Sequence, residues 1–151
     1  MSMETQLKTF VNGAVNYFET VAGRSAEVGM PYLKDTEKDD FLLDCAAVIG
    51  ISGSYRGCVY YSASRQMLEA LMKLSGEDYG APDLALDFVG EIANTIAGNA
   101  QRDLGAGFLI SVPVVIQGIS TVRLPREIPH FIIPIKWQNY KSYIVIAISS
   151  K

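Results

Sequence analysis

An acid and an amide stand three positions apart in the middle of the chain, at Glu91 and Asn94, and a second acid precedes them at Asp87. Residues three and four apart are neighbours on a helix surface, so in a helix these three side chains would project together from consecutive turns. A carboxylate can accept charged hydrogen bonds from the Arg or Lys of a partner. An amide both donates and accepts, so it can hold a water molecule in one orientation. The three residues are therefore a candidate working surface.

Positioning water is one route to phosphoryl hydrolysis, because the transition state is loose and catalysis is mostly orientation and charge stabilisation. The segment has no glycine-rich phosphate loop, no cationic cradle and too few carboxylates for a metal site. We therefore expect no metal or other cofactor on this chain, and a phosphate and its cation would have to arrive on a partner. Spacing alone leaves a plainer alternative open, in which Glu91 and Asn94 are only a solvated helix face.

Two glycines, Gly90 and Gly98, lie beside the three polar residues, and Gln101 follows on the same polar arc. Each glycine costs a helix about 1 kcal/mol relative to alanine, which is tolerable where something must approach the backbone closely. We interpret Asp87, Gly90, Gly98 and Gln101 as partner-binding positions on a docking face.

A third helix must carry this face, and the apolar pattern predicts one that Pro82 and Asp83 open and 105–107 stops. Its apolar residues fill one broad arc opposite the polar residues. They are Ala85, Phe88, Val89, Ile92, Ala93, Ile96, Ala97, Ala100 and Leu104.

Two earlier helices are predicted from the same periodicity. The first runs from Glu4 to Ala22, with Gly23 placed to end it. Ser64 can cap the second, and Gly76 lies past its end. The buried stripe of the second helix is expected to be Met67, Leu68, Leu71, Met72 and Leu74.

Strands are expected in the segments that are too short and too apolar for surface helices. They are 41–52, 58–62, 108–117, 130–137 and 142–149, with hairpin turns at 53–57 and 138–141 and an acidic, solvated turn at 35–40. The order helix, proline-bearing strand, hairpin occurs twice, with Pro31 and Pro113 in the two strands. Residues 16–23 also align with 91–98 without gaps, so we predict an internal duplication.

The composition suits one globular domain: 151 residues, 49% of them apolar and 19% charged. A net charge of −3 with no cluster of Lys and Arg argues against nucleic acid as a partner. No run is long and apolar enough to span a bilayer, and the start of the chain lacks a signal-peptide pattern, so we expect no membrane association and a cytoplasmic location. Cys45 and Cys58 are expected to be buried free thiols, and the single histidine, His130, has no catalytic triad in view.

The spacing Asp87-x-x-x-Glu91-x-x-Asn94, followed by residues 96–98 and by Ile110-Ser111-Val112-Pro113, resembles the CheX branch of the CheC/CheX/FliY chemotaxis phosphatases. Residues 31–34, 49–53 and 55–57 are similar to that family as well, so the resemblance covers nearly the whole chain, as a single CheX-like domain 1–151. It implies an α/β (α+β) fold with a mixed β-sheet, two long antiparallel helices packed on one face, and a CheC-like internal pseudo-twofold repeat.

The resemblance also implies an activity, the dephosphorylation of the aspartyl phosphate of a CheY-like response regulator. Asn94 would orient the attacking water and Glu91 would contact the active-site lysine of the regulator, while Mg²⁺ would belong to the regulator. The first helix offers Asn16 and Glu19 in reversed order, so the chain has one intact motif. One motif per chain is the CheX-like pattern, and the resemblance therefore implies a homodimer. We expect the homodimer to form through sheet edges. The alternative is a non-catalytic response-regulator-binding or flagellar-switch-like interaction module.

Overall fold

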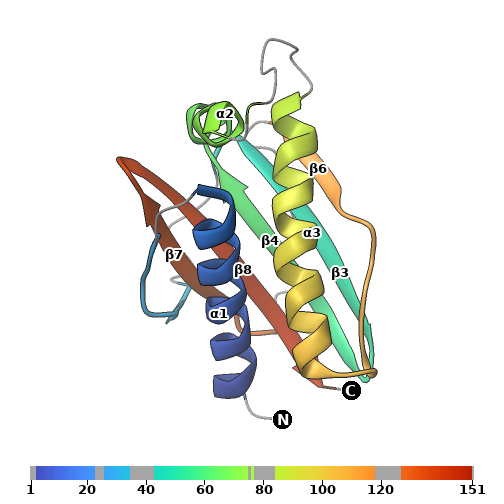
Figure 1. Cartoon of the computed structure of the whole chain (residues 1–151). Helices are drawn as coiled ribbons and strands as arrows, with labels where there is room; N and C mark the ends of the chain where they lie inside the picture. The colour runs from blue at the N-terminus through green and yellow to red at the C-terminus, as the bar shows by residue number, and fades with distance from the viewer. Residues whose placement is uncertain are drawn as a thin grey trace.

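The computed structural model of the chain describes residues 3–22, 26–34, 43–74, 76, 84–117 and 127–150. These residues form an eight-stranded antiparallel sheet with helices on one face (Figure 1). The helices are α1 (Met3–Ala22), α2 (Arg65–Leu74) and α3 (Leu84–Leu104). The strands are β1 (Glu27–Val28), β2 (Tyr32–Leu33), β3 (Cys45–Gly53), β4 (Tyr55–Ala63), β5 (Phe108–Ile110), β6 (Val114–Gln117), β7 (Phe131–Trp137) and β8 (Tyr140–Ser150).

The two long helices, α1 and α3, lie side by side and antiparallel on the sheet, as expected, and α2 is seen end-on near one end of the same face (Figure 1). All nine residues of the predicted apolar arc of α3 are buried. The helix ends at Gly105, whose φ is +95° and whose N–H donates to the carbonyl of Gln101 at 3.0 Å. The predicted helix start at Pro82 and Asp83, the predicted stop of α1 at Gly23 and the acidic turn at 35–40 lie outside the described residues.

Helix α2 is capped as predicted, because the backbone N–H of Met67 donates to Oγ of Ser64 at 3.1 Å. Four of its five predicted core residues are buried. The prediction was wrong for Leu74, which is 54% exposed. It is the last residue of the helix, beyond the packing that covers the preceding turns.

The strands depart from prediction mainly where they begin and end. The single strand expected over 108–117 is two strands, β5 and β6, separated by residues 111–113, because Pro113 has no N–H to continue the ladder. The turn expected at 53–57 is shorter, since Tyr55 already pairs with Ser150 of β8. The turn expected at 138–141 is likewise confined to 138–139, since Trp137 pairs with Tyr140.

The order of the strands bears out the predicted repeat. The two halves of the chain meet at the centre of the sheet, where β4 pairs with β8. The proline-interrupted strand of each half pairs with the hairpin of the other half. Thus β1 and β2 pair with β7, and β5 and β6 pair with β3. Counting equally along β4 from Tyr55 and along β8 from Tyr140 leads to Tyr60 and Val145, which face each other. The pairing is therefore symmetric about that point.

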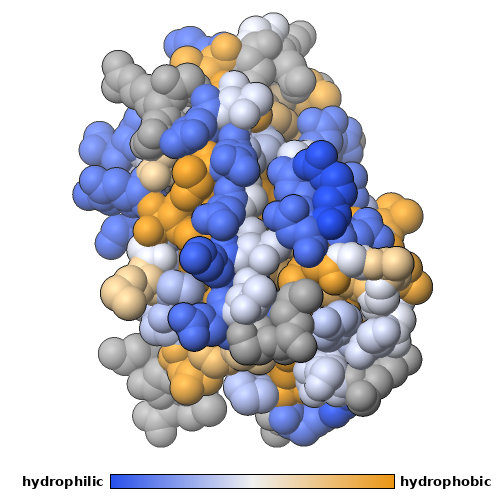
Figure 2. Space-filling view, turned by 60° about the horizontal axis from the view of Figure 1, so that its bottom comes forward, coloured by the Kyte–Doolittle hydropathy of each residue, from blue (hydrophilic) through white to orange (hydrophobic). Residues whose placement is uncertain are grey.

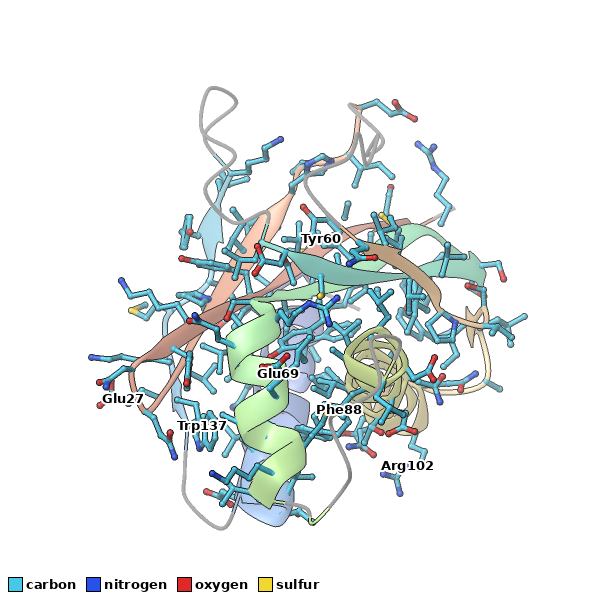
Figure 3. The ribbon with its side chains drawn as sticks, turned by 90° about the horizontal axis from the view of Figure 1, so that it is seen from above. Glu27, Tyr60, Glu69, Phe88, Arg102 and Trp137 are labelled. Atoms are coloured by element: carbon cyan, nitrogen blue, oxygen red, sulfur yellow. The ribbon has the colours of Figure 1, made fainter. Side chains whose placement is uncertain are left out.

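Side chains alternate between the two faces of the sheet. Tyr61 packs in the main core beneath the helices, whereas Tyr60 is buried on the opposite face beside Ile132 and Val145 (Figure 3). Of the helices that the structure describes, none has the length and apolar character needed to cross a membrane.

Candidate active site on the outer face of α3

Helix α3 presents Asp87, Glu91 and Asn94 to solvent, and all three are exposed. Their position follows from the apolar arc: once the buried residues face the sheet, the remaining positions must point outward. Figure 3 shows the same division at two labelled residues of this helix, with Phe88 on its inner side and Arg102 on its outer side. Within the described parts of the chain, none of the side chains of Asp87, Glu91 and Asn94 makes a hydrogen bond or an ion pair. No other described residue occupies the carboxylates or the amide.

A groove of about 600 Å³ runs along this face, between α3 and the edge of the sheet. It brings together four of the six predicted site positions, Asp87, Gly90, Glu91 and Asn94. The opposite wall was not predicted. It consists of Ile110, Ser111, Val112, Pro113 and Val115.

This second wall left a signal in the sequence, the proline at Pro113 in a segment otherwise suited to a strand. A proline within such a run indicates an edge strand or a bulge, and bulges are frequent beside active sites. The sequence could not show which helix the bulge would face.

Gly90 lines the groove and also packs against the opposite wall. Gly90 is buried, and a Cβ built on it would lie 3.1 Å from Cγ1 of Val115 and 3.9 Å from Cγ of Pro113. The close approach that this glycine permits is therefore made by β6 of the same chain. Gly98 is different, because a Cβ there would meet nothing within 4 Å, so its surface stays open.

The other predicted partner-binding positions lie further along α3. Gln101 is half-buried, and neither Gly98 nor Gln101 lines the groove that contains Glu91 and Asn94. Nearby, Arg102 donates a hydrogen bond to Asn99 on the same helix. The structure therefore separates a compact site at 87–94 from these more distant positions.

The corresponding face of α1 is not organised in the same way. Asn16 and Glu19 are both exposed, but Asn16 lines a second groove, between α1 and α3, to which Glu19 does not contribute. The groove that Asn16 lines therefore does not bring the reversed pair together, as the groove on α3 does for Glu91 and Asn94.

Neither cysteine belongs to the groove, and both are free. Cys45 is buried and Cys58 half-buried, and burial raises the pKa of the Cys45 thiol and raises the pKa of Cys58 to about 11. Among the residues described, no three His, Cys, Asp or Glu side chains are grouped so that they could hold a metal ion.

The surface at the end of the molecule where α3 terminates mixes polar and apolar areas (Figure 2). Apolar side chains reach the surface there between polar ones, and the visible face carries no single dominating apolar patch.

Comparison with known proteins gives a consistent picture. Residues 45–136 match a family model described as "Chemotaxis phosphatase CheX". No curated protein sequence matches the chain significantly.

Solved structures resemble the chain along nearly its whole length. The chemotaxis protein CheX from Vibrio vulnificus is 28% identical, with a TM-score of 0.81 over 96% of this chain and 99% of that one. A CheC-like superfamily protein from Shewanella sp. PV-4 is 24% identical, with a TM-score of 0.84 over 99% and 100% of the two chains. A chain of the CheX-CheY-BeF3-Mg²⁺ complex from Borrelia burgdorferi is 22% identical, with a TM-score of 0.76 over 95% and 97%.

Proposed function

The protein belongs to the CheX family of chemotaxis phosphatases, and from this we propose that it removes the phosphoryl group from the phosphorylated aspartate of a CheY-like response regulator. The observation that carries the proposal is the pair Glu91 and Asn94, which is exposed, without partners among the described residues, and set beside a groove. The relative from Borrelia burgdorferi, solved in a complex with CheY, supports a response regulator as the partner.

Asn94 would act on water. Its amide can accept a hydrogen bond from a water molecule and donate one to a phosphoryl oxygen, which places the water in line with the phosphorus. Because Asn94 stands on the outer surface of a helix, it can enter the active site of a partner.

Glu91 would act on the partner. Its carboxylate lies one turn from Asn94 on the same face, where it can pair with a lysine beside the phosphorylated aspartate and fix the orientation of docking. Asp87, one turn further, would add to the negative charge that meets the regulator. Mg²⁺ would be held by the regulator, where it would stabilise charge on the phosphoryl group.

The decisive experiment follows the loss of phosphate from response regulators of the same cell after phosphorylation with a small-molecule donor. The protein should shorten the phosphoryl lifetime of at least one regulator. Asn94→Ala should lower the catalysed rate by about 100-fold or more, as for the loss of one preorganised group at a transition state. Glu91→Ala should also weaken binding.

The matched control is Asn16→Ala, which removes an exposed asparagine from the equivalent face of α1. It should leave the rate unchanged. An unchanged phosphoryl lifetime with every regulator of the cell would refute the enzymatic proposal. Binding of a regulator without any release of phosphate would instead favour the interaction-module alternative.

A further inference from the structure

The wall opposite Glu91 is built by a β-bulge. Ile51 pairs with Ile110 and Val48 pairs with Val114, so the three residues 111–113 oppose only two residues of β3. Such an extra residue bends the bulged strand locally.

Hydrogen bonds hold the base of the bulge. The N–H of Ser111 donates to the carbonyl of Gly50 at 2.9 Å, and the N–H of Gly50 donates to Oγ of Ser111 at 2.8 Å. A Cβ on Gly50 would already lie 3.4 Å from this Oγ, so the two chains are close. Two hydrogen bonds therefore anchor the bulge to β3 at Ser111.

Val112, at the middle of the bulge, is 82% exposed although it is a large apolar residue. It lines the same groove as Glu91 and Asn94. A partner that fills this groove would contact Val112 together with the two polar side chains. Further apolar surface follows at Val114 and Val115, which are exposed as well.

The bulge argues against a second copy of the chain as the occupant. Strand addition needs a flat edge with regularly spaced N–H and C=O groups, and bulges and prolines prevent it. Here the bulge breaks the spacing and Pro113 has no N–H, yet the apolar side chains remain exposed. The edge is suited to contact through side chains.

We propose that Val112 is a docking residue that packs against an apolar patch beside the phosphorylated aspartate of the response regulator. This inference rests on the proposed function and adds a determinant of partner choice to it. Val112 sets affinity by burial of its side chain, whereas Glu91 and Asn94 act on the reacting groups.

The internal repeat supplies a control for this inference. In the first half, Val28 pairs with Ile135 and Tyr32 with Ile132, so residues 29–31 form the same kind of bulge. Its middle residue, Met30, is 86% exposed, but within the described segments no Glu and Asn in the order of Glu91 and Asn94 stand beside it.

The test compares Val112→Asp and Met30→Asp. Each variant would be assayed for dephosphorylation kinetics and for binding to a regulator carrying BeF3⁻, a mimic of the phosphoryl group. Val112→Asp should raise KM and Kd about ten-fold or more, because a buried valine contact is lost, and should leave kcat within about two-fold. Met30→Asp should change neither. Val112→Ala should give a smaller rise, and Val112→Ile should retain wild-type affinity.

If the wild type dephosphorylates a regulator and Val112→Asp has the same KM as the wild type, this inference is overturned and the proposed function stands. A change of sedimentation in Val112→Asp without a change of KM would show that the edge contacts another copy of the chain instead, and would overturn it too. Absence of both turnover and binding in the wild type would overturn both proposals.

Discussion

At the scale of single residues, the candidate site consists of side chains that are exposed and make no hydrogen bond or ion pair with other described residues. Glu91 and Asn94 are exposed and bind no other described residue, whereas Gly90, beside them, is packed against Val115. Two glycines of the same helix thus differ in their surroundings, because Gly90 faces β6 and Gly98 faces open space.

This difference predicts unequal responses of stability to alanine at the two positions. Gly98→Ala should raise the free energy of unfolding by about 0.5 to 1 kcal/mol, because alanine favours the helix and its Cβ meets nothing. Gly90→Ala should gain less or lose stability, because its Cβ would crowd Cγ1 of Val115 at 3.1 Å. Urea unfolding of both variants is the measurement, and an equal gain from both would contradict the packing described for Gly90.

At the scale of elements, the site is the contact between a helix and a sheet edge. Helix α3 supplies the polar residues, and the bulge between β5 and β6 supplies the apolar wall. Both are held by the central strands, since β3 pairs with both β5 and β6 and is itself paired with β4.

Two buried titratable side chains on strand β4 should make the stability of the fold depend on pH. Burial raises the pKa of Cys58 from its ordinary value of 9.0 to about 11. The unfolded chain therefore releases this proton first, so the contribution of the neutral thiol to stability is complete below pH 9 and is lost as the pH rises towards 11. Burial also raises the pKa of Tyr61 on the same strand, which adds to the loss at higher pH.

Urea midpoints measured between pH 8 and pH 11 would test this. The urea midpoint of the wild type should fall across this range. The midpoint of Cys58→Ala should fall less between pH 9 and pH 10, where Tyr61 is still mostly protonated in the unfolded chain. Identical slopes for the two proteins would show that Cys58 does not titrate differently in the folded state.

At the scale of the whole molecule, the described part of the sheet ends in two edges related by the internal repeat, and both are interrupted by bulges at a proline. A single domain over 1–151, a cytoplasmic location and a homodimer remain predictions. The bulges restrict a dimer formed through sheet edges to the straight parts of the edge strands, or to side-chain contacts such as those available to Leu33, which is 60% exposed.

A homodimer would have twice the 16.5 kDa mass of the chain. Sedimentation equilibrium over a range of concentrations should show that species, and Leu33→Lys should weaken it if the edge formed by β2 is the interface. A monomer mass at every concentration would refute the predicted dimer. A dimer unaffected by Leu33→Lys would place the interface elsewhere.

The amino-acid sequence by itself determined the helices, the hairpins, the internal repeat and the polar face of α3. Each of these depends on patterns within one segment: the apolar arc of α3, the cap at Ser64 and the repeated prolines at Pro31 and Pro113. Only the tertiary structure decided that Val112 and Pro113 form the other wall of the site and that Gly90 serves the strand of its own chain. These are contacts between segments that are separate in the chain, and they depend on pairing register. Register follows from the packing of the whole sheet, which periodicity within one segment does not specify.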